Sequence, residues 1–198
     1  MTASRKKGEL SSAAKTEFYR ILAERNIRKD IFEDDNKFLE YLERVSVSSK
    51  AMEFGKFTEA EARAFYELNT GAKVEECGFI VSDEEQIWGD SPDGLVYDGA
   101  FIVGCIEIKC PKPATFQEYV CRLNSGETLK EIESKYYWQI VNHLAVSKAE
   151  WCDFILYEPM SCNGFKVVRF TAEELSEDIS ALAAKVSEFK ALIIQENI

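Results

Sequence analysis

A tight turn and the apolar strand that follows it constrain the fold of this chain more than any other stretch. The turn is Ser91-Pro92-Asp93-Gly94, in which proline fixes one backbone dihedral and glycine permits a sharp reversal. The strand is Cys105-Ile106-Glu107-Ile108-Lys109-Cys110. Because side chains alternate across a strand, Glu107 and Lys109 are predicted to project from one face and the two isoleucines from the other. A carboxylate and an ammonium therefore share one face of a rigid element.

The residues between the turn and the strand predict a β-hairpin. Residues 95–103 contain two short apolar runs around Asp98-Gly99, a dipeptide typical of hairpin turns. The hairpin would return Glu107 and Lys109 to the neighbourhood of Asp93. Two carboxylates beside a lysine suit a hard divalent cation such as Mg²⁺, and the lysine can then orient or deprotonate an attacking water. The plainer alternative is a surface ion pair beside a turn, which contributes at most about 1 kcal/mol to stability.

Length and composition favour one globular domain, which we expect to span residues 1–198. Hydrophobic residues make up 46% of the chain, yet no run of about 18 apolar residues exists, so no membrane span is expected. Residues 1–7 lack the apolar stretch of a secretion signal, and the six cysteines contain no C-x-x-C pair. These features predict a cytoplasmic protein whose cysteines are reduced core thiols.

The net charge of −11 argues against a general DNA-coating protein, because phosphate contacts require local lysine and arginine. It does not exclude nucleic acid as a substrate if acidic and basic side chains occupy different surfaces. The basic residues that would then gather on one surface are Arg5, Lys6, Lys7, Lys15, Lys50, Lys56 and Lys109.

The remaining pattern predicts an α/β fold with a mixed β-sheet flanked by α-helices. Helices are expected after Ser11 or Ser12, within residues 30–50, over residues 53–69, 115–122 and 128–147, and after a capping box at residues 171–174. Gly71 is the expected C-terminal stop of the helix over residues 53–69. Strands are expected over residues 73–81, 151–157 and 165–170. The apolar seam of the last helix packs either on the sheet or against another subunit.

Three further features each have a functional and a plain interpretation. The basic stretch before Ser11 and Ser12 is either a phosphate cradle at a helix N-terminus or a solvated tail that ends in a cap. Glu59 lies close to the apolar stripe of its helix, so it either serves a site or marks the margin of an amphipathic helix. His143, the one histidine of the chain, is interpreted as a structural residue on a helix.

Four motifs occur in order along the chain. They are Lys6-Lys7-Gly8-Glu9-Leu10-Ser11-Ser12, Phe54-Gly55-Lys56-Phe57-Thr58-Glu59-Ala60-Glu61-Ala62-Arg63, the Asp93 turn with the Glu107 strand, and Tyr136-Tyr137-Trp138-Gln139. Together they resemble the phage lambda exonuclease and YqaJ-type viral recombinase nucleases of the PD-(D/E)XK superfamily. The resemblance covers roughly residues 5–170. It implies a restriction-endonuclease-like mixed sheet and a single PD-(D/E)XK exonuclease domain over residues 1–198.

The resemblance also implies roles for individual residues. Asp93, Glu107 and the backbone carbonyl of Ile108 would ligate Mg²⁺, and Glu59 would hold a second ion, with Mn²⁺ as an alternative metal. Lys109 would position or activate the water, and Gln139 would help to order the site. The pocket for a terminal 5′-phosphate would be formed by Lys6, Arg5, Ser11, Ser12 and Ser91. Met52 falls where a wedge that separates the terminal base pair is expected.

The activity implied by the resemblance is a Mg²⁺-dependent 5′-to-3′ exonuclease acting on double-stranded DNA ends. It would hydrolyse the 5′-phosphorylated strand to mononucleotides and leave a 3′ single-stranded overhang for a phage-type single-strand annealing protein. Relatives form a homotrimeric ring, which suggests the same assembly here, in a bacterial host and of phage or prophage origin. The alternatives are a structure-specific endonuclease or resolvase on the same core, and a catalytically silent DNA-binding recombination module. The presence of Asp93, Glu107 and Lys109 together argues against the silent module.

Overall fold

The structure, a computed structural model, describes residues 32–39, 50–82, 87–161 and 163–195, with side chains from residue 58 to residue 193 in the last three of these ranges. The chain divides into two compact units, residues 1–47 with 187–198 and residues 48–186. In the first unit, residues 35–39 are helical, and Asp34 caps this segment by accepting hydrogen bonds from the N–H groups of Asn36 and Lys37. The helix expected after Ser11 or Ser12 lies outside the described residues.

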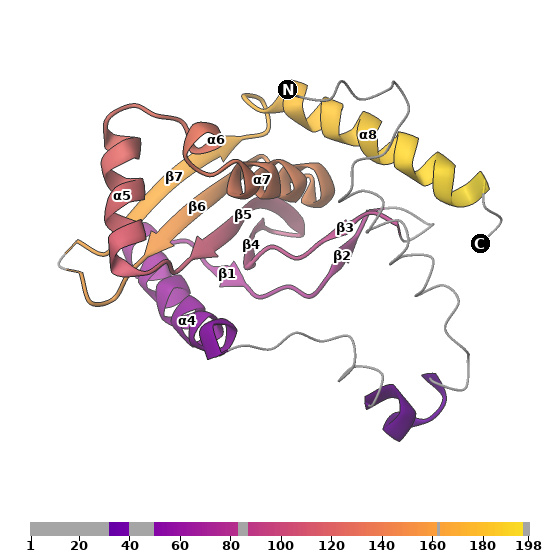
Figure 1. The fold of residues 1–198 in the computed structure, drawn as a ribbon, viewed down its shortest axis with the longest axis horizontal. Coiled ribbons are helices and arrows are strands. Elements are labelled where there is room, and N and C mark those ends of the chain that lie inside the picture. The colour runs from indigo at the N-terminus through magenta and orange to yellow at the C-terminus, as the bar shows by residue number, and fades with distance from the viewer. Residues whose placement is uncertain (1–31, 40–49, 83–86, 162, 196–198) are drawn as a thin grey trace, which may run out of the picture. The chain divides into compact units, whose positions relative to one another are not determined.

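The second unit contains a five-stranded mixed sheet, as predicted (Figure 1). Its strands, in spatial order, are β1 (Val74–Glu75), β4 (Gly94–Asp98), β5 (Phe101–Lys109), β6 (Trp151–Tyr157) and β7 (Phe165–Thr171). Strands β5 and β6 are parallel, and the other neighbouring pairs are antiparallel. A separate two-stranded sheet pairs β2 (Ile80–Val81) with β3 (Gly89–Asp90). Strand β5 thus lies at the centre of the main sheet.

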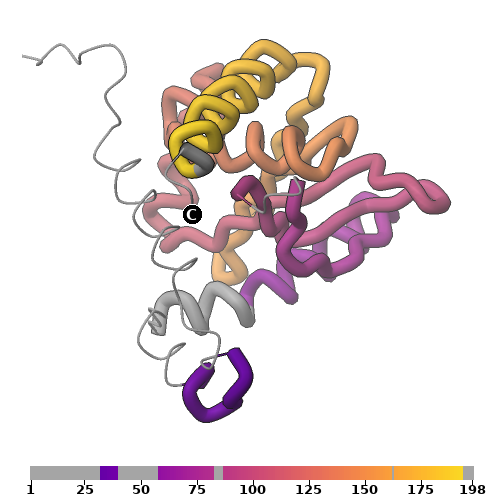
Figure 2. Tube along the Cα trace, turned by 90° about the vertical axis from the view of Figure 1, so that its right-hand side faces the viewer, coloured from indigo at the N-terminus to yellow at the C-terminus, as the bar shows by residue number. Residues whose placement is uncertain are grey.

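Helices flank both faces of this sheet. They are α4 (Lys50–Thr70), α5 (Pro113–Asn124), α6 (Leu129–Ile132), α7 (Ser134–Ser147) and α8 (Ser176–Gln195). Helix α4 lies on one side of the strands and α7 on the other, as the side view in Figure 2 shows. None of the helices in the described part of the chain combines the length and the apolar character needed to cross a membrane.

The alternation of side chains along β5 separates two hydrophobic cores. Ile106 and Ile108 pack with Ala62 and Tyr66 of α4. Cys105 belongs to the second core, together with the side chains of α7 and the first turns of α8. Glu107 and Lys109 therefore project toward α7, on the face opposite to the isoleucines, as the sequence predicts.

Two predicted elements are wrong in extent because each is interrupted by local hydrogen bonding. The strand expected over residues 73–81 is two short strands, since β1 pairs with β4 whereas β2 pairs with β3. The helix expected over residues 128–147 is divided at Glu133, whose backbone is extended and whose carboxylate accepts a hydrogen bond from the N–H of Lys135. Glu133 thereby starts α7 as a new helix.

Other boundaries follow the sequence pattern with small shifts. Gly71 ends α4 with a positive φ of 73°, and its N–H donates to the carbonyl of Glu67. The capping box between Thr171 and Glu174 forms, although α8 itself begins at Ser176. The core-thiol prediction holds for the buried Cys105 and Cys152, whereas Cys121 is exposed.

A buried polar network ties α4 to the sheet. The hydroxyl of Tyr66 donates to Asp153 Oδ2 at 2.6 Å, and Arg169 donates to both oxygens of Asp153 at 2.7 Å. Tyr66 and Asp153 are almost completely buried. One carboxylate therefore satisfies groups from α4 and from β7.

We expect Asp153→Asn to lower the free energy of unfolding by about 2 kcal/mol, because an amide cannot accept all three of these hydrogen bonds. Tyr66→Phe should cost about 1 kcal/mol, since it removes one donor and leaves the arginine contact intact. Urea unfolding of the two variants and the wild type measures both effects. Equal losses of stability in the two variants would contradict the role of Asp153 as the acceptor of all three hydrogen bonds.

Candidate active site

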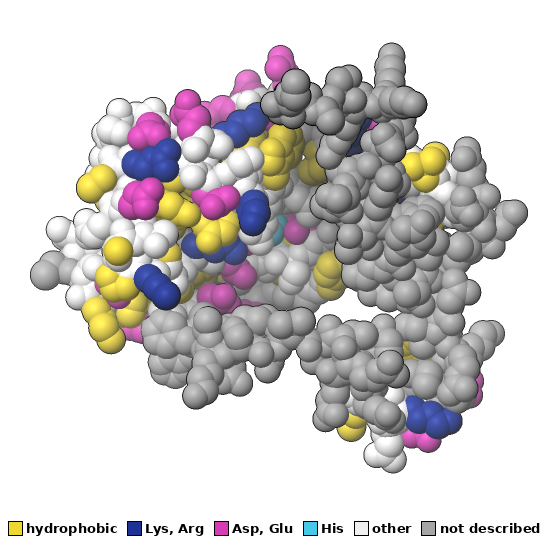
Figure 3. Space-filling view, in the orientation of Figure 1, with side chains coloured by type: hydrophobic (Ala, Val, Ile, Leu, Met, Phe, Trp, Pro, Cys, Tyr) yellow, Lys and Arg dark blue, Asp and Glu magenta, His cyan; other side chains and the backbone are white. Residues whose placement is uncertain are grey.

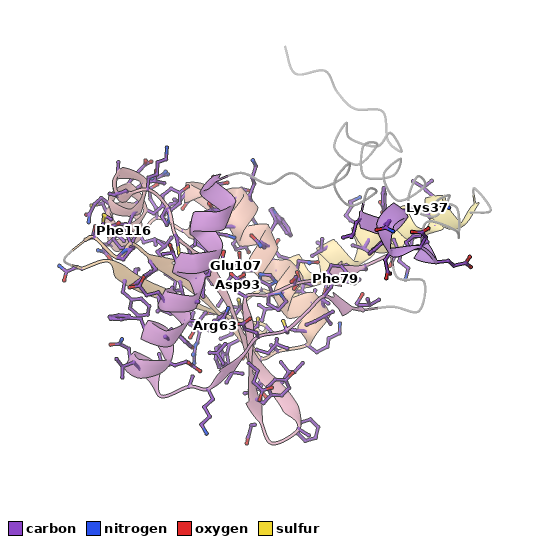
Figure 4. All side chains as sticks on the ribbon, turned by 90° about the horizontal axis from the view of Figure 1, so that it is seen from below. Lys37, Arg63, Phe79, Asp93, Glu107 and Phe116 are labelled. Atoms are coloured by element: carbon purple, nitrogen blue, oxygen red, sulfur yellow. The ribbon has the colours of Figure 1, made fainter. Side chains whose placement is uncertain are left out.

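Asp93 is fixed between the tight turn and the end of β5. Its backbone N–H donates to the carbonyl of Ile106 at 3.1 Å, and its Oδ2 accepts a hydrogen bond from the N–H of Ile108 at 2.7 Å. Pro92 in the same turn is buried, and its carbonyl accepts a hydrogen bond from the thiol of Cys77. The hairpin thus returns β5 to Asp93 as predicted, and Figure 4 shows Asp93 and Glu107 next to each other.

Glu107 and Lys109 form an ion pair on the α7 side of the sheet. The Glu107 side chain is 1% exposed, and the Nζ atom of Lys109 contacts its Oε1. The same Nζ atom lies 5.1 Å from the centre of the Tyr136 ring on α7, within reach of a cation–π interaction. Burial lowers the pKa of Lys109, but the carboxylates of Glu107 and Asp93 raise it by more, so the lysine remains an ammonium.

His143 joins Glu107 to a further carboxylate that the sequence analysis did not single out. Its Nε2 lies 2.6 Å from Glu107 Oε2, and its Nδ1 lies 2.5 Å from Asp90 Oδ2. Asp90 Oδ1 accepts a hydrogen bond from Asn142, whose own side-chain oxygen accepts one from the indole of Trp88. His143 is buried on a helix, as predicted, and in addition it contacts the predicted site.

The two carboxylates of the predicted site have opposite pKa shifts. Burial, followed by the charge of Glu107, raises the pKa of Asp93 to about 6. Burial also acts to raise the pKa of Glu107, but the hydrogen bond from His143 and the charge of Lys109 lower it below its ordinary value. Although burial opposes it, contact with Asp90 and Glu107 raises the pKa of His143 to about 10. Glu107 is therefore ionised over the whole physiological range, whereas Asp93 titrates just below neutrality.

Three of the remaining predicted site residues have described side chains. Glu59 is half-buried on α4, and its charge contributes to the raised pKa of Asp93. Gln139 is half-buried on α7, one helical turn before His143 and on the same helix face. Ser91 is exposed in the turn. Lys6, Arg5, Ser11, Ser12 and the side chain of Met52 lie outside the described residues.

The side chains of this site fit a divalent cation in their chemistry. Asp93 and Glu107 supply hard oxygen donors, and the Lys109 ammonium already supplies positive charge at Glu107 Oε1. Among the described residues, no three His, Cys, Asp or Glu side chains converge as a complete ligand set. A bound Mg²⁺ would thus depend on Asp93 and Glu107 together with backbone carbonyl, water or phosphate oxygens, as is usual for this ion.

On the face shown in Figure 3, the described lysine and arginine side chains are interspersed with aspartate and glutamate. The basic residues expected to gather on one surface lie outside the described side chains, with the exception of Lys109.

A family model described as YqaJ-like viral recombinase domain matches residues 2–150. Among curated proteins, none matches the chain.

Several solved structures share the fold. An alkaline exonuclease from Laribacter hongkongensis, LHK-Exo, is 28% identical over 81% of this chain and 81% of its own, with a TM-score of 0.54. LHK-Exo in complex with dAMP is 25% identical over 96% and 94% of the two chains, with a TM-score of 0.55. A phage-related exonuclease from Haemophilus somnus 129PT is 14% identical over 100% and 90%, with a TM-score of 0.56, and supports the fold alone.

The raised pKa of Asp93 predicts a pH-dependent gain in stability on Asp93→Asn. The folded protein protonates Asp93 at higher pH than the unfolded chain does, so its ionised form destabilises the metal-free fold above about pH 6. The variant should therefore increase the free energy of unfolding by about 2 kcal/mol near pH 8. This gain should vanish as the pH is lowered toward 3.8, the ordinary pKa of an aspartate.

Urea unfolding in EDTA at a series of pH values measures this difference. The exposed Asp98 at the hairpin tip supplies the control, since Asp98→Asn should leave stability almost unchanged at every pH. A gain for Asp93→Asn that is independent of pH would contradict the electrostatic cause.

Proposed function

Because the chain belongs to the family of YqaJ-like viral recombinase domains, as its motifs predict, we propose that it is a metal-dependent exonuclease of DNA recombination. Family membership places it among the recombination nucleases, which act on DNA and generally depend on divalent metal ions. In finer detail, it hydrolyses the 5′-phosphorylated strand of a duplex end in the 5′-to-3′ direction. The products are mononucleotides and a 3′ single-stranded overhang. The observation that carries the proposal is the Asp93 carboxylate bonded to β5 beside the Glu107–Lys109 pair.

Each residue of the site has a chemical task in this reaction. Asp93 and Glu107, with the backbone carbonyl of Ile108, hold Mg²⁺, and Glu59 supports a second ion, with Mn²⁺ able to replace either. When bound, Mg²⁺ supplies stabilisation of the negative charge at the scissile phosphate. Because its pKa is raised, Lys109 acts as an ammonium that donates hydrogen bonds to the attacking water or the phosphate. Gln139 orders the site from α7.

The proposal extends to substrate contacts and assembly. Lys6, Arg5, Ser11, Ser12 and Ser91 bind the terminal 5′-phosphate, and Met52 separates the terminal base pair. The chain forms one nuclease domain over residues 1–198 and assembles as a homotrimeric ring around DNA. It works with a phage-type single-strand annealing protein in the cytoplasm of a bacterial host, with a phage or prophage origin. The solved complex of the related Laribacter exonuclease with dAMP, a mononucleotide, agrees with mononucleotide release.

An assay on four DNA substrates tests the activity. The substrates are linear duplexes with and without a 5′-phosphate, a circular duplex with one 5′-phosphorylated nick and a closed circular duplex, each incubated with Mg²⁺ or with EDTA. We expect mononucleotides only from linear, 5′-phosphorylated DNA in the presence of Mg²⁺. Nicking of closed circles would indicate an endonuclease or resolvase instead, and the absence of metal-dependent cleavage would indicate a silent binding module.

Lys109→Met should reduce cleavage by about a thousandfold, because it removes the hydrogen-bond donor while keeping the aliphatic length of the side chain. The Lys109 side chain is only 23% exposed and neutralises Glu107, so some loss of stability is also expected. Cleavage rates are therefore measured well below the melting temperature of the variant. Lys73→Met, at an exposed lysine beside β1, is the control, and near-normal turnover of Lys109→Met would refute the assigned role.

Glu59→Gln tests the second metal ion. We expect the Mg²⁺ concentration for half-maximal cleavage to rise by about tenfold, because the variant loses a negatively charged oxygen donor near Asp93. The matched control is Glu61→Gln on the same helix, where the amide can still accept the hydrogen bond from the Tyr157 hydroxyl. An unchanged Mg²⁺ dependence in Glu59→Gln would count against a second ion at this residue.

A further inference from the structure

We propose that His143 and Asp90 are positioning residues that hold Glu107 in the orientation needed for metal binding. The inference rests on the proposed function, since it assigns Glu107 as a ligand. It is carried by three linked contacts within the described residues, from Asp90 through His143 and Glu107 to Lys109.

The two oxygens of Glu107 have different partners. His143 Nε2 lies 2.6 Å from Oε2, so this oxygen is held from helix α7. The other oxygen, Oε1, faces Lys109. The imidazole therefore distinguishes the two oxygens, and Oε1, which the Lys109 ammonium contacts, is the one that it leaves for a metal ion to share.

The imidazole of His143 is itself anchored at its other ring nitrogen. Asp90 Oδ2 holds the Nδ1 atom of His143, which fixes the ring plane. Asp90 is in turn held by Asn142, and Asn142 by the indole of Trp88. His143, Asp90 and Glu107 are all more than nine-tenths buried, so water does not compete for these contacts. The chain of hydrogen bonds that ends on Glu107 therefore runs through residues of helix α7 and of the small β2–β3 sheet.

The contacts of His143 differ from those of a residue that serves ordinary core packing. A metal site binds its ion more tightly when neighbouring residues fix the orientation of its carboxylate ligand. Loss of a contact that orients the ligand typically weakens metal binding by 10- to 100-fold. A histidine that served packing alone would not need to bridge two carboxylates. The contacts also span separate elements, because Asp90 is on β3, His143 on α7 and Glu107 on β5.

The test measures Mn²⁺ binding to the full chain without DNA, by isothermal titration calorimetry, beside the Mg²⁺ dependence of cleavage. His143→Gln keeps an N–H donor for Glu107 but sets its amide oxygen against the Asp90 carboxylate. We expect its Mn²⁺ dissociation constant to rise by about tenfold or more. The double variant Asp90→Asn with His143→Gln supplies an amide N–H toward that oxygen, and its affinity should return to within about threefold of the wild type.

Ser147→Ala is the control, because it removes a buried hydroxyl that donates to the backbone carbonyl of His143 and leaves the imidazole contacts in place. It should bind Mn²⁺ as the wild type does. Circular dichroism in EDTA checks the fold of each variant. Unchanged affinity in His143→Gln would overturn the proposal, as would equal weakening in the single and double variants.

Failure of the proposed function gives a different result. In that case the wild type itself neither binds Mn²⁺ nor cleaves linear DNA, and the positioning role falls with it. A wild type that binds metal and cleaves DNA, beside a His143→Gln variant of equal affinity, would refute the positioning role alone.

Discussion

The burial of an ionised glutamate on the central strand is the constraint on which the rest of this structure depends. Glu107 is 1% exposed, and an isolated carboxylate at such a depth is strongly unfavourable. Lys109 and His143 contact its two oxygens from the same strand and from α7. The charge is therefore stabilised only when β5 and α7 are correctly packed, which couples the integrity of the site to that of the fold.

The sheet makes this arrangement possible through the alternation of side chains on β5. Ile106 and Ile108 pack in the core beneath α4. Because side chains alternate along the strand, Glu107 and Lys109 face α7. A shift of one residue in register would bury the charged pair against α4 and turn the isoleucines toward α7. The bond from the N–H of Ile108 to Asp93 opposes such a shift, because it joins the strand to the turn at one position.

The parts of this arrangement that the sequence predicts are local in the chain. The hairpin, the opposite faces of Glu107 and Ile106, and the return to Asp93 follow from turn chemistry and from a two-residue period. The bridge between His143 and Asp90 could not be predicted in this way, since 53 residues and several elements separate the two. The break at Glu133 was missed because a side chain satisfied a backbone N–H within a continuous helical pattern.

Burial acts to raise the pKa of both Glu107 and Asp93, and an unequal distribution of positive charge gives the two shifts opposite signs. Both described cations of the site, Lys109 and His143, contact Glu107, whereas Asp93 receives a single backbone N–H. Burial, the charge of Glu107 and the charge of Glu59 therefore raise the pKa of Asp93 to about 6, and the N–H of Ile108 and the charge of Lys109 offset them only in part. Positive charge therefore acts more weakly on Asp93 than on Glu107, so a bound divalent cation would relieve the repulsion mainly at Asp93.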